Sequence, residues 1–208
     1  MDLDPLSRLG YSALMPHSTC CKEGGEPLRE PLLLMLGGFT ICFNLAIAFH
    51  ELGHVLLYAL TGEKLVQFVL NPFSWSWATG ERAHIGVLWG GVSLGLGLSL
   101  IPLLFVRGFR LPVRIFLAHL LAACALLING LYLAMGLLLR FGDGAALKEM
   151  GVPPGLILLL GTAYVLLSLA FWTRIQTDLG LSRDTPLPRR LAIISGGIAP
   201  YMTLIFLY

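Results

Sequence analysis

Long apolar runs separated by short polar stretches dominate the pattern of this chain. Five runs are long enough, or nearly so, to cross a hydrocarbon core of about 30 Å, which takes about 20 helical residues. They are Leu32–Leu60, His84–Val106, Val113–Leu139, Pro154–Thr173 and Leu191–Tyr208. The pattern predicts an all-α polytopic membrane protein with about five transmembrane helices, that is, a multi-pass integral membrane protein.

The segment after the first run changes from a helical to a strand-like pattern. Thr61-Gly62 is typical of a helix end. Lys64–Leu70 is rich in strand-forming residues, Asn71-Pro72 favours a turn, and Phe73–Ala78 alternates between polar and apolar residues. We therefore expect a small β-hairpin at the membrane surface, directly after the first transmembrane helix.

Three aromatic residues of this hairpin are candidate substrate contacts. Trp75 and Trp77 suit the membrane–water interface, where tryptophan commonly serves as an anchor. A strand edge beside a functional site can also pair with an extended peptide. We therefore predict that Phe73, Trp75 and Trp77 contact such a peptide, with interfacial anchoring as the alternative.

The composition agrees with a membrane protein. The 208 residues are 56% hydrophobic and only 12% charged, whereas a soluble domain usually carries about 25% charged residues. The net charge of +2 and the lack of a basic cluster interleaved with aromatic residues predict a lipid bilayer, and no nucleic acid, as partner. We expect a polar N-terminal tail at residues 1–31 and one membrane-embedded domain at 32–208, with its core at 32–152.

One ionisable cluster, His50-Glu51-Leu52-Gly53-His54, interrupts the first run. A helix turns about 100° per residue, so His50 and His54 lie one turn apart, with Glu51 on the same face. Ionisable side chains inside a membrane-length segment cost several kcal/mol and are typically functional. Two such imidazoles can bind Zn²⁺, and the carboxylate can take a proton from a water molecule on the metal. A structural polar cluster is the alternative interpretation.

Asp143, in the loop Arg140–Gly144, is the candidate third ligand. The first and third runs cross in the same direction, so this loop emerges on the side where the first helix ends. However, Asp143 lies thirty residues after Val113, the start of the third run, and His50 only eighteen after Leu32, the start of the first. For straight helices this is a mismatch of about 18 Å. The chain must therefore fold back after Leu139, which the glycines allow. An ordinary turn aspartate is the competing interpretation.

The third run also contains His119 and Asn129. His119 lies six residues from the start of its run, which places it near the opposite face from His50, so we do not expect it to bind the metal. Asn129 is closer to the depth of the cluster. It is a candidate to bind a substrate carbonyl or to support a metal ligand, and a helix-packing amide is the equally weighted alternative.

These motifs, taken in order, resemble the site-2 protease family of intramembrane zinc metalloproteases. The resemblance rests on Phe49–His54 inside a transmembrane helix, Gly62 before a short β segment, the glycine-rich span around Gly90-Gly91, and Asp143-Gly144 two crossings later. It covers roughly Leu32 to Val152. The Asn-Pro-rich approach to the Asp-Gly pair and the soluble insertions of the family are missing, so the chain looks like a minimal or divergent member.

The resemblance implies Zn²⁺ bound by His50, His54 and Asp143, with Glu51 as the catalytic general base. It implies hydrolysis of a peptide bond in or near a membrane-embedded protein or peptide substrate. Two alternatives remain open. One is a non-catalytic membrane pseudoprotease that acts as a binding or assembly subunit, and the other is a metalloprotease whose third ligand is a glutamate such as Glu149.

Overall fold

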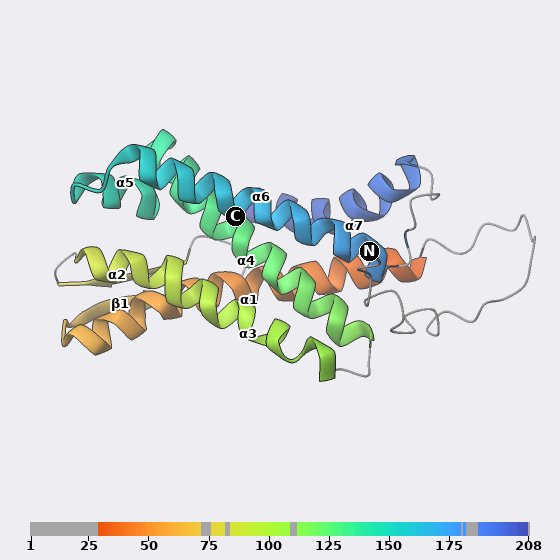
Figure 1. The fold of residues 1–208 in the computed structure, drawn as a ribbon, viewed down its shortest axis with the longest axis horizontal. Helices are drawn as coiled ribbons and strands as arrows, with labels where there is room; N and C mark the ends of the chain where they lie inside the picture. Colours follow the sequence, from red (N-terminus) through yellow and green to blue (C-terminus); the bar gives the residue numbers. More distant parts are fainter. Residues whose placement is uncertain are drawn as a thin grey trace, which may run out of the picture.

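The computed structural model describes residues 29–71, 76–81, 84–108, 112–179, 181 and 187–207. Over these residues the chain is mostly helical, with long helices lying side by side along the longest axis (Figure 1). The elements are α1 (Arg29–Thr61), β1 (Leu65–Val69), β2 (Trp77–Gly80), α2 (Ile85–Gly90), the π-helix η2 (Gly91–Gly95), α3 (Leu96–Leu104), the 3₁₀ turn η3 (Val106–Gly108), α4 (Pro112–Leu139), α5 (Gly142–Glu149), α6 (Pro154–Asp178) and α7 (Leu187–Leu207). Most of the predicted N-terminal tail lies outside the described residues.

Four stretches of helix are long and apolar enough to cross a membrane. They are Pro31–Thr61, Ile85–Leu104, Val113–Leu139 and Pro154–Asp178. These stretches confirm the first four predicted runs. The fifth predicted run, Leu191–Tyr208, largely forms α7, which is not among the four, so the predicted count of five spans is not confirmed.

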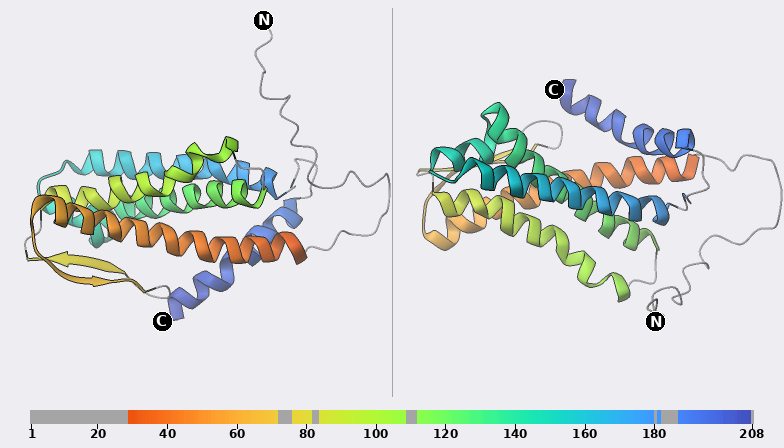
Figure 2. Two further views of the ribbon diagram at one scale, coloured as in Figure 1. Left: turned by 90° about the horizontal axis from the view of Figure 1, so that it is seen from below. Right: turned by 45° about the horizontal axis from the view of Figure 1, so that its top comes forward.

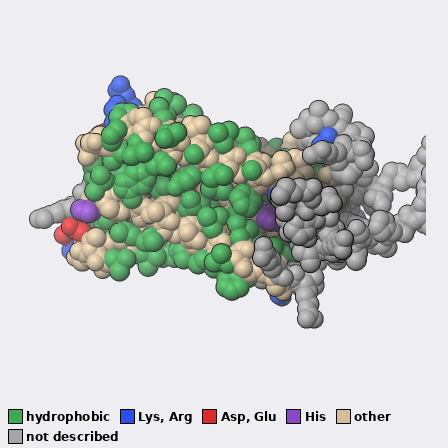
Figure 3. Space-filling view, viewed as in Figure 1, with side chains coloured by type: hydrophobic (Ala, Val, Ile, Leu, Met, Phe, Trp, Pro, Cys, Tyr) green, Lys and Arg blue, Asp and Glu red, His purple; other side chains and the backbone are tan. Residues whose placement is uncertain are grey.

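The outer surface fits a lipid environment. Hydrophobic side chains cover the middle of the face shown in Figure 3, and charged side chains gather at its two ends. Large apolar side chains on the helices are widely exposed, among them Ile41, Leu104 and Leu159. Soluble monomers rarely expose contiguous apolar surface on this scale, whereas lipid tails solvate it without cost.

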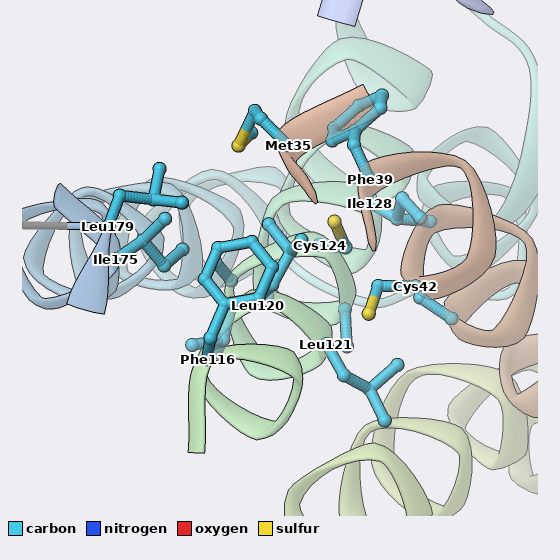
Figure 4. Packing of buried hydrophobic residues seen from close by; sticks show 14 of the residues in the cluster. Met35, Phe39, Cys42, Phe116, Leu120, Leu121, Cys124, Ile128, Ile175 and Leu179 are labelled. Atoms are coloured by element: carbon cyan, nitrogen blue, oxygen red, sulfur yellow. The ribbon is translucent and has the colours of Figure 1, made fainter. Parts of the chain in front are cut away.

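The core lies where α4 packs between α1 and α6. Met35, Phe39 and Cys42 of α1 meet Phe116 and Leu120 of α4, all at most 2% exposed (Figure 4). Glycine pairs bring the helices closer still, since a Cβ on Gly130 of α4 would lie 2.8 Å from the carbonyl oxygen of Gly161 on α6. α4 is therefore held on both sides, and its position relative to α1 is fixed by dense packing.

The glycine-rich second span packs directly against α1. A Cβ added at Gly53 of α1 would overlap the carbonyl oxygen of Gly90, and one added at Gly95 would lie 2.5 Å from Cα of His50. Only glycine allows backbones to approach this closely. The π-helical turn Gly91–Gly95 lies at this contact, which places it directly beside the ionisable cluster of α1.

The predicted β-hairpin is present. α1 ends at Thr61, where Gly62 adopts φ +71° and the N–H of Glu63 donates to the carbonyl of Tyr58, an arrangement that satisfies the last carbonyls of a helix. β1 and β2 then pair antiparallel and run back along α1 (Figure 2). β2 begins at Trp77, and Ser76 before it is not part of a strand. Phe73 and Trp75, which belong to the predicted strand segment, lie outside the described residues.

Candidate metal centre

His50 and His54 meet on one face of α1, as their spacing predicts. Their Nε2 atoms lie 3.2 Å apart, and the two rings meet edge to face. The two residues are 1% and 5% exposed, respectively. Two imidazoles buried in an apolar helix require partners for both ring nitrogens.

A tight reversal after α4 brings Asp143 to these rings. Arg140 and Gly142 both adopt left-handed backbone conformations, with φ of 61° and 59°, and the N–H of Phe141 donates to the carbonyl of Gly136. α5 then packs back on α4 so closely that a Cβ at Gly144 would overlap the backbone of α4. The predicted fold-back therefore occurs, and it removes the mismatch in depth between Asp143 and the histidines.

The three side chains form a group that could hold a metal ion. Oδ2 of Asp143 lies 3.0 Å from Nε2 of His50 and 3.5 Å from Nε2 of His54. Among the residues that the structure describes, this is the one cluster of three or more His, Cys, Asp or Glu side chains with metal-binding spacing. Glu149, the alternative third ligand, lies at the exposed end of α5 and is not part of the group.

Hydrogen bonds at the far side of each ring fix which nitrogen faces the group. Nδ1 of His54 lies 2.7 Å from the carbonyl oxygen of Val87. A carbonyl can only accept, so Nδ1 carries the proton and Nε2 presents a lone pair. Nδ1 of His50 lies 2.9 Å from Oδ1 of Asn129, which likewise accepts. Both Nε2 lone pairs therefore point towards Asp143.

Three electron-pair donors thus converge at one point. Oδ2 of Asp143 is buried and receives no hydrogen bond from a neighbouring donor, so its contacts with the two Nε2 atoms are stabilising only when a cation or a proton lies between them. Burial alone would raise the pKa of the Asp143 carboxyl, but when the two rings carry the proton between them, their hydrogen bonds and positive charge hold this pKa well below its usual range. The carboxylate is therefore ionised and available as a ligand.

Position 91 leaves space in front of the ligand atoms. A Cβ added at Gly91 would overlap Nε2 of His54 and lie 2.9 Å from Cε1 of His50. The absence of a side chain in this turn of η2 is therefore what keeps the point of convergence open.

Glu51 adjoins the group inside a cavity of about 130 Å³. The residue is 3% exposed, and its carboxyl group faces the backbone N–H of Ala78 in β2. The cavity is lined by His50, Glu51, His54, Tyr58, Ser76, Trp77, Ala78, Val87, Leu88, Tyr132, Gly142 and Asp143. It has room for several water molecules and is bounded on one side by the hairpin.

The remaining candidate residues fall in three places. Trp77 lines the cavity, whereas Phe73 and Trp75 lie outside the described residues. Asn129 is fully buried behind His50 and does not line the cavity. His119 pairs with Asp178 at 2.6 Å, between α4 and α6, and is not part of the metal-binding group, as expected from its depth.

Three features of the site were not anticipated from the sequence. They are the carbonyl of Val87, the open position at Gly91 and the ring of Tyr132, whose centroid lies 4.9 Å from that of His50. Tyr132 follows Asn129 by about one helical turn, so both lie on the same face of α4. The helical period could therefore have indicated Tyr132 as a neighbour of the site. The first two depend on how the second span packs on α1, for which a single sequence carries no signal.

Comparison with protein-family models, with curated proteins and with solved structures finds no match to the chain.

Proposed function

We propose that this chain is a multi-pass membrane protein and a zinc metalloendopeptidase of site-2 protease type, which hydrolyses a peptide bond in or near a membrane-embedded substrate. The observation that carries the proposal is the convergence of His50, His54 and Asp143 beside Glu51, in a cavity formed by membrane-length helices. A buried carboxylate beside a metal-binding group is the arrangement that metal-assisted hydrolysis requires.

The donor set suits zinc. Two imidazole nitrogens and one carboxylate oxygen are the protein ligands of many hydrolytic zinc sites, in which the fourth position stays open. Ligands about 2.05 Å from a tetrahedral ion lie about 3.3 Å from one another, and the observed separations are 3.0, 3.2 and 3.5 Å. When bound, the ion would polarise the scissile carbonyl and lower the pKa of a water molecule.

Glu51 supplies the proton transfer. Its carboxylate lines the same cavity as the ligands, so it can take a proton from the attacking water and pass it to the nitrogen of the leaving amine. The N–H of Ala78 faces this carboxylate. Hydrolysis then needs no further acid or base from the chain.

The hairpin presents the substrate. A peptide bond inside a helix has its carbonyl already hydrogen-bonded, so the substrate must first become extended, and its freed N–H and C=O groups then need partners in an apolar environment. β2 borders the cavity through Trp77 and Ala78, and its edge away from β1 faces Glu51. An extended substrate can pair with this edge beside the metal group.

A test of this function uses purified protein in liposomes with Zn²⁺ and a set of transmembrane peptides. Cleavage by the wild type and its loss in Glu51→Gln, with bound zinc unchanged, is the expected result, because the amide cannot act as a base. Cleavage by Glu51→Gln at the wild-type rate would refute the mechanism. Zinc binding without cleavage by the wild type would instead favour a non-catalytic pseudoprotease.

A further inference from the structure

Asn129 lies directly behind a metal ligand and away from the cavity. It is 0% exposed, and its Oδ1 lies 2.9 Å from Nδ1 of His50. Because it does not line the cavity, a substrate in that cavity would not touch it. Its Oδ1 is therefore available to orient the His50 ring.

We propose that Asn129 is a positioning residue of the metal centre, which holds His50 with Nδ1 protonated and Nε2 directed at Asp143. The proposal rests on the metal site of the proposed function, and not on peptide hydrolysis. Ligating histidines usually donate their second N–H to a neighbouring acceptor, and loss of that acceptor typically weakens metal binding 10- to 100-fold.

The direction of the hydrogen bond between Asn129 and His50 follows from the contact of the amide nitrogen, Nδ2. Nδ2 of Asn129 donates to the carbonyl of Ala125 at 2.8 Å, one turn earlier in α4. The opposite orientation would place Oδ1 against that carbonyl, two acceptors facing each other in a buried site, which is costly. Oδ1 therefore faces His50 and can only accept, so the ring must carry its proton on Nδ1.

α4 thereby controls two parts of the centre at once. Asn129 orients the first ligand, and the turn at Arg140–Gly142 leads directly from the end of α4 to the third ligand, Asp143. His54 depends instead on a backbone carbonyl, that of Val87 in α2. A substitution can therefore remove the support of His50 selectively and leave that of His54 in place.

The test compares zinc affinity, by competition with a chromophoric chelator, in Asn129→Leu and Asn129→Asp. The leucine variant removes the acceptor and should bind zinc 10- to 100-fold more weakly than the wild type. The aspartate variant keeps an acceptor oxygen and should bind at least as tightly as the wild type. Asn129→Ala, which adds no methyl groups, repeats the measurement should the leucine variant fail to fold.

A second readout needs no metal. The ¹⁵N resonances of the imidazoles in metal-free protein report which nitrogen carries the proton, and we expect Nδ1 in the wild type and a mixture at His50 in Asn129→Leu. Ser168→Ala is the matched control, since its hydroxyl is also fully buried and donates to a carbonyl of α4, that of Ala123. It should lower thermal stability and leave zinc affinity unchanged.

Three results would overturn the proposal. The first is that Asn129→Leu and Asn129→Ala both bind zinc as tightly as the wild type. The second is that Ser168→Ala loses as much zinc affinity as Asn129→Leu. The third is that His50 keeps its proton on Nδ1 in the leucine variant. A wild-type protein that binds no zinc would overturn both this inference and the proposed function. A wild-type protein that binds zinc but cleaves no peptide would refute the protease alone, and the affinities of the Asn129 variants would still decide the positioning role.

Discussion

The open position at Gly91 makes a single methyl group a sharp probe of the proposed metal centre. The change Gly91→Ala places a Cβ where it overlaps Nε2 of His54 and lies 2.9 Å from Cε1 of His50. Ordinary contacts of a Cβ begin at 3.4 Å. The His50 ring must therefore retreat by about 0.5 Å, and the His54 ring by about twice that, in a densely packed interior.

The size of the effect follows from the tolerance of metal sites. Ligand distances hold to about 0.2 Å, and a structural zinc site contributes about 10–16 kcal/mol from four ligands. Moving a ligand ring by several times this distance tolerance should cost about one quarter of that binding free energy, the contribution of one ligand, or about 2.5–4 kcal/mol. At about 1.4 kcal/mol per factor of ten, zinc affinity should fall by roughly 10²- to 10³-fold.

The assay is zinc affinity of the purified protein by chelator competition, with circular dichroism to confirm helix content. Gly97→Ala is the matched control, because Gly97 belongs to the same helical span and a Cβ there meets nothing within 4 Å. It should leave zinc affinity unchanged. Equal affinity of the Gly91→Ala protein and the wild type would refute the assignment of the ion to the point where the three ligand atoms converge.

Two further predictions concern the ligands themselves. Asp143→Ala should lower zinc affinity by roughly 10²- to 10³-fold, the share of one ligand, whereas Glu149→Ala on the same helix should not; metal content measured side by side decides between them. Zinc affinity should also fall as the pH is lowered from about 8 to 5, because protons compete for the imidazoles. Asp143, whose pKa is held below its usual range, stays ionised throughout, and a flat profile over this range would contradict histidine ligation.

The membrane helices could be predicted because their hydrophobicity and length are local properties. The third run matches the span Val113–Leu139 at both ends. The fourth run corresponds to α6, which continues five residues beyond the predicted end at Thr173, to Asp178. Its terminus is stabilised by the hydrogen bond between Nδ1 of His119 on α4 and Oδ2 of Asp178, a tertiary contact that the apolar pattern does not contain.

The candidate site divides in the same way. His50, Glu51 and His54 follow from the period of one helix, and the structure brings the histidines together on that face. Asp143 could be proposed only as the end of a loop that had to fold back. The reversal uses a left-handed Arg140, which non-glycine residues adopt rarely, so residue type gives no signal for it.

The edge of β2 provides the last prediction. Ala78 lies directly opposite Phe68 in the antiparallel register, and its N–H faces Glu51, so it points away from β1. Ala78 and Phe68 therefore form an antiparallel pair that is not hydrogen-bonded. In such a pair, each residue directs its N–H away from the partner strand. Phe68 therefore has its N–H on the outer edge of β1, away from the metal group.

Proline at either position removes an edge N–H and leaves the hydrogen bonds between the strands intact. Ala78→Pro removes the donor that faces Glu51 and the substrate, and should slow cleavage about tenfold, the value of one backbone hydrogen bond of roughly 1.4 kcal/mol. Phe68→Pro, the matched change on the outer edge, should not. Zinc content should be unchanged in both, because neither residue contacts a ligand. Equal cleavage rates in the two variants would mean that the hairpin serves as an interfacial anchor and that the substrate is held elsewhere.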